Sequence, residues 1–451
     1  MRRINILILT MLLVLMAVLS GCTGDGGSTS STNQPSDSPR ETQKSSESSK
    51  PAAPVALNLW TFNELHKTYY EKTAELWNQT HPDQPINLTV ESYPNAEMHN
   101  KLLIALQSGV GAPDVVDINV NFFSNFLKGD IQLVELNDLV APEKDKFVQS
   151  RFDIYSKDGK IYGTPFHVGA TVVYYNKEIM DQAGVNPDAI KTWADFIEAG
   201  KKVVVATGKP MTAFEVTNQR PFWPMIVQQG SDYLDKNGDV ILDNETNIRT
   251  LNAMHDMIYK DKIAIPMPGG DTTKEEFFTF MNQGEMGALI MPMWYMSRFL
   301  SYMPDLEGKI IVRPMPVWKD GDSRSAGMGG TGTAVTKQSK NQEAAMQFLA
   351  FAKLTREANI RIWQELKFDP PRWDVWDAPE LQQPDPYFGN EAVFNTLLQM
   401  KDEIKSPNMG ELITAAQDLV NSSVMFKALK DQSQTPEQAL KAAAEELRKQ
   451  K

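Results

Sequence analysis

Apolar and polar positions follow strand and helix periods in turn from residue 57 onward. Apolar side chains alternate from Leu57 to Phe62, and the next segment repeats them at helical spacing until His81-Pro82 stops it. Two further strands and one further helix, which Gly109 closes, come next. The predicted elements are strands 57–62, 86–90 and 114–118 and helices 64–80 and 96–108. Their βαβαβ order predicts an α/β fold with parallel strands.

The rest of the chain continues as strands and helices without an internal repeat. The predicted elements are strands 171–175 and 288–291, a helix capped by Thr192 that runs to about Ala199, an amphipathic helix at 343–354, and helices from Pro407 onward. About 400 residues follow position 54, which is more than one hydrophobic core usually holds, so we expect two lobes.

The N-terminus has the pattern of a secretory signal. Arg2 and Arg3 precede an apolar run from Ile6 to Leu19, which is too short to span a membrane. The run ends at Leu19-Ser20-Gly21-Cys22, and Cys22 is the only cysteine of the chain. This arrangement resembles a bacterial lipoprotein, exported, cut before Cys22, and held by lipid on that residue at the outer face of the cytoplasmic membrane. The alternative is an ordinary cleaved signal that leaves a free cysteine.

Residues 23–50 are almost entirely small, polar or charged, with no aromatic or aliphatic side chain. Such a segment cannot bury apolar surface, so we expect a flexible linker between the lipid and the folded part.

Composition excludes some classes of partner. The chain is 41% hydrophobic and 23% charged, which is typical of a globular protein, and its net charge of −12 becomes −14 when Arg2 and Arg3 leave with the signal. A surface this acidic repels phosphate backbones and anionic lipids, so we expect no nucleic-acid partner and no membrane contact beyond the lipid. The body has no cysteine pair, so its core alone must stabilise it.

The strand order indicates where a ligand would lie. Ligands of open α/β sheets bind beyond the carboxyl ends of the strands. The ends of the first and third strands place residues 60–63 and 117–121 at one rim.

A series of short motifs resembles, in its order along nearly all of the mature chain, the family 1 extracellular solute-binding proteins, the carbohydrate receptors of ABC importers. The motifs are Trp60, Gly111-Ala112-Pro113-Asp114, Tyr162-Gly163-Thr164-Pro165-Phe166, Tyr174-Tyr175-Asn176-Lys177-Glu178, Lys191-Thr192-Trp193, residues 282–288 ahead of Trp294, and residues 344–349. The resemblance implies a two-lobed fold of the periplasmic-binding-protein kind, with a ligand cleft between two sheets flanked by helices.

Within that family the chain most resembles receptors for arabino-oligosaccharides. The residues that carry this resemblance are 60–66, 126–129, His167-Val168-Gly169, 291–296 and 372–376. It implies a lobe of residues 55–167 and 328–370 and a lobe of residues 168–327 and 371–451, after a signal peptide at 1–21 and a lipidated linker at 22–54.

A sugar presents an apolar ring face and a rim of hydroxyls, so its receptor needs aromatic platforms and side chains that both donate and accept hydrogen bonds. The candidate platforms are Trp60, Trp294, Tyr295 and the Arg372-Trp373 pair. Each tryptophan could instead pack in a core or, for Trp373, at the lobe interface.

Polar candidates cluster at the predicted rims. On the first lobe they are Asn63, Glu64, Asp117, Asn119 and Asn121, which could equally cap helices or end strands. From the second lobe the resemblance implies Glu215, Asn218 and Arg220. His167 lies where the chain crosses between lobes, so it could contact ligand or serve the hinge.

Two motif matches do not indicate a cofactor or an ion. Residues 327–332 match G-x-G-x-x-G, but a strand-like segment follows where a dinucleotide site needs a helix. Residues 235–239 resemble a calcium loop, but the glycine comes early and Thr246 stands where the loop needs Glu, so we expect a hairpin turn. The histidines have no metal spacing.

The sequence therefore predicts a monomeric receptor, without cofactor, metal or catalysis, that closes on an oligosaccharide and presents it to permease subunits. The alternatives are a lipid-anchored glycoside hydrolase, which needs a facing carboxylate pair, a receptor for xylo-, galacto- or malto-oligosaccharides, and a receptor for peptides or metal chelates.

Overall fold

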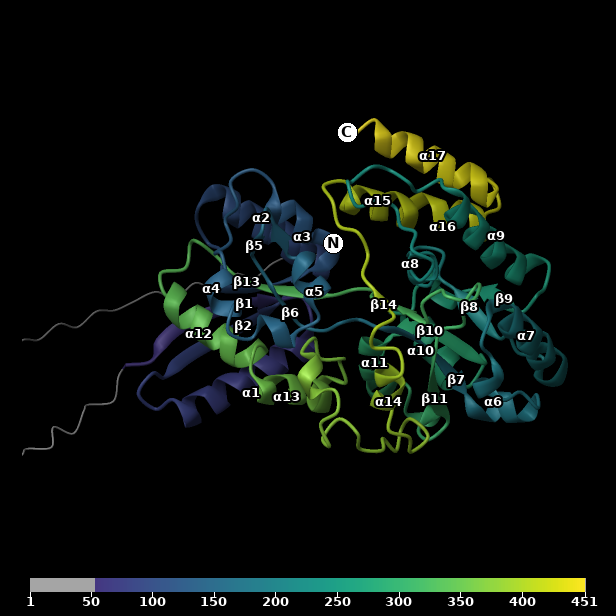
Figure 1. The fold of residues 1–451 in the computed structure, drawn as a ribbon, viewed down its shortest axis with the longest axis horizontal. Helices are drawn as coiled ribbons and strands as arrows, with labels where there is room; N and C mark the ends of the chain where they lie inside the picture. Colours follow the sequence, from purple (N-terminus) through teal and green to yellow (C-terminus); the bar gives the residue numbers. More distant parts are fainter. Residues whose placement is uncertain (1–52, 451) are drawn as a thin grey trace, which may run out of the picture. The chain divides into compact units, whose positions relative to one another are not determined.

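The computed structural model describes residues 53–450 of the chain (Figure 1). The predicted signal at 1–21, the lipidation site Cys22 and all but the last two residues of the linker at 22–54 lie outside the described residues. Within the part that is described, no helix is long and apolar enough to cross a membrane.

The first sheet has five strands in the order β2-β1-β3-β13-β6. Strand β1 (Val55–Thr61) pairs in parallel with β2 (Ile86–Ser92) and β3 (Val115–Asn119), whereas β13 (Thr331–Val335) pairs antiparallel with β3 and with β6 (Thr164–Pro165). The connecting helices are α1 (Glu64–Thr80) and α2 (Asn95–Ser108). The predicted βαβαβ opening is therefore confirmed, and the boundaries differ by two residues at most.

Helices cover both faces of this sheet, so its central strands are buried on both sides (Figure 1). Leu57 and Leu59 of β1 pack in one core with α1 and with α12 (Gln342–Lys353). Trp60, on the opposite side of the strand, packs in a second core against α2. The alternation of side chains along β1 thus decides which residues of that strand reach which layer.

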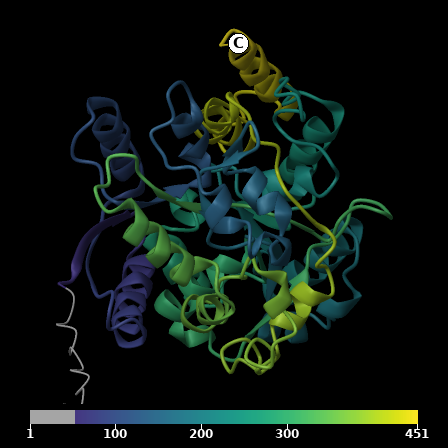
Figure 2. The ribbon, with the colours of Figure 1, turned by 60° about the vertical axis from the view of Figure 1, so that its left-hand side comes forward.

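The second sheet is antiparallel and three-stranded. Strand β7 (Thr171–Asn176) lies between β10 (Ala288–Pro292) and β11 (Ile310–Pro314). One face of β7 packs against a core that includes α7 (Trp193–Thr207) and the C-terminal helix α17 (Pro436–Arg448). Figure 2 shows the C-terminal helices beside α9 (Glu245–Tyr259), with which α17 is in contact. The described residues therefore form two lobes, each with its own sheet and its own cores.

The remaining elements are short or lie around these two sheets. Those of the first half are α3 (Val120–Phe123), η1 (Ser124–Leu127), α4 (Asn137–Val140), η2 (Lys144–Lys146), α5 (Gln149–Asp153), β4 (Ser156–Lys157), β5 (Lys160–Ile161), α6 (Lys177–Gln182), η3 (Pro187–Ala189), β8 (Thr212–Phe214) and α8 (Phe222–Val227). Those of the second half are β9 (Ala264–Pro266), η4 (Pro268–Gly270), α10 (Glu275–Asn282), η5 (Met293–Tyr295), α11 (Met296–Tyr302), η6 (Pro304–Leu306), β12 (Ser325–Ala326), α13 (Arg356–Leu366), η7 (Trp373–Val375), α14 (Phe394–Leu398), β14 (Ile404–Lys405), α15 (Ile413–Leu419), η8 (Val420–Val424) and α16 (Met425–Leu429).

Two local predictions can be compared with the structure directly. The helix after Thr192 is longer than predicted and runs to Thr207. Its added part includes Val203, which is fully buried, and it ends at Gly208, which adopts the left-handed conformation. The predicted turn at 235–239 is confirmed, because the Asp235 amide donates to the Asp239 carbonyl and the flanking residues form an antiparallel bridge.

Segments that cross between the lobes are joined to one another by hydrogen bonds. The Met328 amide donates to the Gly169 carbonyl at 2.8 Å, and the Val168 amide donates to the Asp369 carbonyl at 2.9 Å. The buried Asp369 carboxylate accepts from the Gly169 amide at 3.1 Å and from the Ala170 amide at 2.7 Å. One side chain therefore fixes the crossing at 168–170 to the crossing at 369.

The pH dependence of stability tests this carboxylate. Burial raises the pKa of Asp369 to about 6, although the two amides act in the other direction. An unfolded Asp has a pKa near 3.9, so the folded state binds the carboxyl proton of Asp369 more tightly than the unfolded state does. Protonation of Asp369 therefore stabilises the fold, and this contribution is complete below about pH 4 and lost as the pH rises through 6. Urea unfolding measures the difference in unfolding free energy between the wild type and Asp369→Asn at each pH. We expect this difference to shift in favour of the wild type by about 2 kcal/mol when the pH is lowered from roughly 7.5 to 4.5. A difference that does not change with pH would contradict the assignment.

Candidate functional site

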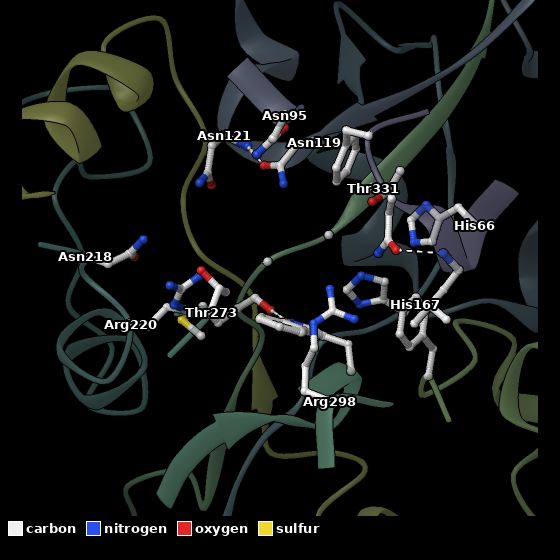
Figure 3. Close-up of a pocket in the computed structure, with 18 of the residues that line it drawn as sticks. His66, Asn95, Asn119, Asn121, His167, Asn218, Arg220, Thr273, Arg298 and Thr331 are labelled. Atoms are coloured by element: carbon white, nitrogen blue, oxygen red, sulfur yellow. Dashed lines mark hydrogen bonds between the residues drawn. The ribbon is translucent and has the colours of Figure 1, made fainter. Parts of the chain in front are cut away.

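A cavity of about 640 Å³ lies where the strand ends of the first sheet face the second lobe (Figure 3). Eight of the predicted site residues line it, namely Asn63, Glu64, Asn119, Asn121, His167, Asn218, Arg220 and Trp294. Sequence reasoning missed other lining residues, among them His66, Asn95, Asp271, Thr273, Phe278, Arg298 and Tyr302.

Amide side chains form the wall that the first lobe contributes. Asn63 caps α1 by accepting from the Leu65 amide at 3.0 Å, and Asn119 caps α3 by accepting from the Asn121 amide at 2.9 Å. Asn63 and Asn119 therefore cap helices and also line the cavity, and their contact with a ligand stays a prediction. Asn121 Oδ1 is buried and has no hydrogen-bond partner among the described residues. Asn121 lines the cavity, and an acceptor there without a partner suits a ligand that donates hydrogen bonds.

His99 holds this amide wall in place. Its Nδ1 lies 2.7 Å from the Asn95 carbonyl, and its Nε2 accepts from the Asn119 amide at 2.9 Å, so Nδ1 carries the proton. The ring stacks on Phe122 at 4.3 Å. Burial lowers the pKa of His99 to about 4, against the opposing hydrogen bond to Asn95. The neutral ring thus joins the start of α2 to the end of β3 without adding charge.

Below this wall a network of hydroxyl and imidazole groups surrounds the Asp117 carboxylate. Asp117 accepts from Thr61 at 2.9 Å, from Tyr70 at 2.7 Å and from Thr333 at 2.8 Å, and it lies 2.9 Å from His66 Nδ1. Burial would raise the pKa of Asp117, but His66, the charge of Lys353 and the hydrogen bond from Tyr70 together outweigh it and lower the pKa to about 2. The carboxylate is fully buried and does not line the cavity. It supports His66, which does.

A group of charged residues forms the wall that the second lobe contributes. The Arg220 guanidinium donates to both oxygens of Glu215 at 3.0 and 3.1 Å and to Asp271 at 2.6 Å. Burial raises the pKa of Glu215, which lies outside the cavity and also accepts from the Thr272 amide. Burial acts on Asp271 too, but the Arg220 charge together with hydrogen bonds from Thr273 and Asn218 outweighs it and lowers the pKa of Asp271. Glu215 therefore positions Arg220, which lines the cavity.

Aromatic side chains form the floor and one edge. Trp294 donates from Nε1 to the Met328 carbonyl at 3.1 Å and lies against Gly329 on a crossing segment. At the edge, Phe278 and Tyr302 stack with their centroids 4.5 Å apart and their planes 6° apart, and Tyr302 is 52% exposed. Arg298, Ser301 and Tyr302 lie three and four residues apart on α11, and this helical spacing is the signal that sequence reasoning overlooked.

Trp60 is placed elsewhere. It is 4% exposed, donates from Nε1 to Glu91 at 2.7 Å and packs edge-on against Tyr93. It does not line the cavity, whereas Phe62, two residues further on, does. Both residues lie on the side of β1 that faces α2, but the strand ends at Thr61, so Trp60 packs in the core whereas Phe62, past the strand end, reaches the cavity.

Three other predicted residues also lie away from the cavity. Tyr295 is buried and donates to the Thr272 carbonyl at 2.7 Å. Arg372 is buried and pairs with Asp374 and Glu143, each at 2.6 Å. Trp373 is 51% exposed and donates to the Asp145 carbonyl. The structure thus brings neither these three nor Trp60, Asp117 and Glu215 to the cavity surface.

The described residues include no cluster of three or more His, Cys, Asp or Glu side chains that could hold a metal ion.

The fold and the cavity define a two-lobed receptor, and comparison with known proteins gives its family. Residues 61–358 match the family model for bacterial extracellular solute-binding proteins, and the chain belongs to this family. Members of this family are binding proteins of transporters, not enzymes.

Relatives and solved structures agree with this assignment. The chain is 51% identical, over 87% of its length and 92% of the relative's, to the arabinooligosaccharide-binding protein of Bacillus subtilis. It is 48% identical, over 87% of its length and 88% of the relative's, to the arabinooligosaccharide-binding protein of Halalkalibacterium halodurans. The GacH receptor of Streptomyces glaucescens has the same fold, with a TM-score of 0.73 and 20% identity over 88% of this chain and 98% of that one. The predicted family and fold class are confirmed.

The contrast between Trp60 and Tyr302 predicts different costs of truncation. Trp60→Ala removes a buried ring and should lower the unfolding free energy by about 3–5 kcal/mol. Tyr302→Ala removes a half-exposed ring and should cost less than about 1 kcal/mol. Urea unfolding of both variants measures this, and equal costs would contradict the placement of the two rings.

Proposed function

We propose that the protein captures arabino-oligosaccharides in this cavity and delivers them to the permease of an ABC importer. The observation that carries the proposal is the cavity itself, which has amide side chains on one wall and aromatic faces on its floor and edge. Amides donate and accept at once, as vicinal hydroxyls require, and the aromatic faces suit the apolar side of a sugar ring. The names of the two bacterial relatives support arabinose as the sugar.

A hydrolytic function has little support in the cavity. Glu64 and Asp271 are the carboxylic acids among the described lining residues. A glycosidase needs a general acid whose pKa is raised, but Arg220 keeps the pKa of Asp271 low and occupies its carboxylate. Binding without catalysis is therefore the function that the side chains favour.

We propose that capture proceeds by hinge closure. The lobe boundaries proposed from the sequence, residues 55–167 with 328–370 and residues 168–327 with 371–451, divide the chain near the hydrogen-bonded crossings at Gly169, Met328 and Asp369. A ligand that contacts both walls favours the closed arrangement, because the open one offers it fewer contacts. The closed form would then be what the permease recognises.

Export and anchoring are proposed from the sequence. The family is extracellular, which agrees with a signal peptide at 1–21 and lipid on Cys22 as the link to the membrane. We also propose that the protein is a monomer and that its ligand site needs no cofactor.

Calorimetry against arabino-, xylo-, galacto- and malto-oligosaccharides of equal length tests the proposed ligand. We expect the arabino series to bind most tightly. We also expect Asn121→Ala to weaken that binding about tenfold, because a hydrogen bond to a buried acceptor is lost. Asn395 is exposed on α14 and lies outside the cavity, so it provides the matched control, and Asn395→Ala should bind as the wild type does. Tighter binding of another series would replace the proposed sugar, and no binding of any series would contradict the function.

Replacement of Cys22 by Ser tests the proposed anchor. The variant cannot carry the lipid, so we expect it in the aqueous phase of a detergent partition when the wild type expressed in the same bacterium enters the detergent phase. Partition of both proteins into detergent would argue against the lipoprotein assignment.

A further inference from the structure

Arg298 is a cation in the cavity wall that the protein itself leaves without a counter-ion. It lies on α11, and its guanidinium points into the cavity in Figure 3. Its hydrogen bond within residues 53–450 is one long contact from Nη1 to Ser297 Oγ at 3.5 Å. No carboxylate of the described residues forms an ion pair with it.

The contrast with Arg220 on the same wall is direct. Arg220 is neutralised by Glu215 and Asp271. The Asp271 carboxylate is thus already paired with Arg220. Glu64 is the other acidic residue that lines the cavity, and it is exposed in the first turn of α1 on the opposite wall. Burial lowers the pKa of Arg298 and so does the charge of Arg220, whereas Tyr302 and Tyr295 act in the other direction without outweighing burial. Neither tyrosine is a carboxylate that could pair with the guanidinium. The charges around Arg298 therefore leave its own charge uncompensated.

Closure of the lobes makes this cation costly unless a ligand compensates it. A charge taken out of water is unfavourable without a partner. A guanidinium has five donors and no acceptor, and its fork matches a carboxylate in a bidentate pair. Sugar hydroxyls can accept its hydrogen bonds, but they bring no opposite charge. A carboxylate brings both.

We propose that the cleft binds saccharide chains that carry a carboxylate, as a uronic or aldonic acid unit, and that Arg298 holds this group. The inference rests on the proposed saccharide-binding function and adds a class of substrate to it. The amide wall and the aromatic edge bind the neutral part of the chain, and Arg298 selects for the acidic unit.

The experiment compares matched ligands by calorimetry with the full chain at low salt. The ligands are arabinotriose, the aldonic acid made from it by oxidation of the reducing end, an arabinose chain with a glucuronate at its other end, and free glucuronate. We expect at least one acidic chain to bind about tenfold more tightly than arabinotriose, because an ionic hydrogen-bonded pair is added. Added salt should reduce this advantage, and free glucuronate should bind far more weakly than the chain.

Variants show whether Arg298 is the cause. Arg298→Gln should abolish the advantage of the acidic chain, and Arg298→Lys should keep part of it, because the charge remains but the fork is lost. Arg249 is exposed on α9, outside the cavity, and contacts Gln229. Arg249→Gln removes the same charge from the surface and should leave the advantage intact.

Failure of the inference differs from failure of the proposed function. If arabinotriose binds but no acidic chain binds more tightly, or if Arg298→Gln keeps the advantage, the inference is wrong and the function stands. If Arg298→Gln and Glu64→Gln weaken neutral and acidic chains alike, Arg298 pairs with Glu64 on closure and the inference is also wrong. If no saccharide binds, the function is wrong.

Discussion

The Asp369 carboxylate is the interaction on which the arrangement of the two lobes depends. It accepts the amides of Gly169 and Ala170, and the Gly169 carbonyl in turn accepts from Met328. Gly169 adopts a φ of 75°, and a Cβ there would lie 2.5 Å from the Met328 carbonyl oxygen, so this close crossing requires glycine. Short backbone contacts thus join the crossing segments to one another. The lobes also meet where α15 lies against α3, because the Thr414 hydroxyl donates to the Asn121 carbonyl at 2.7 Å. The proposed closure would therefore turn about the crossings and change the contact between α15 and α3.

The two walls of the cavity are preorganised by different means. On the first lobe, helix caps and the neutral His99 ring fix the amides, so a ligand does not have to order them. On the second lobe, Glu215 and Asp271 fix Arg220 through charge. Both devices reduce the side-chain entropy that binding must overcome. The cost that remains is that of bringing the walls together.

Much of the fold could be predicted from the sequence, because α1 and the opening strands carry clear hydrophobic periods and capping residues. Helix α7 was predicted too short because Val203 and its two β-branched neighbours are typical of strands. The rim of the first lobe was also predictable, since the carboxyl ends of β1 and β3 meet at one edge.

The side chains at that rim were harder to assign. Leu59 and Trp60 are adjacent apolar residues, so the sequence pattern left open which of them faces α2. A carboxylate such as Asp117 usually lies at a surface, and only the hydroxyls and the imidazole that converge on it from α1, β1 and β13 explain its burial. Those partners are as much as 216 residues away in the chain. Local pattern carries no signal of such a network.

The position of α11 explains how the second lobe completes the site. The strand β10 ends at Pro292, and the chain passes Trp294 on the floor before α11 begins at Met296. One short connection therefore places a floor residue, a cation and an edge aromatic on consecutive turns that face the cavity. Trp294 also donates to the Met328 carbonyl on a crossing segment. Under the proposed hinge closure, a ligand that contacts this floor would act directly on that segment, and the indole would couple occupancy of the cavity to the angle between the lobes.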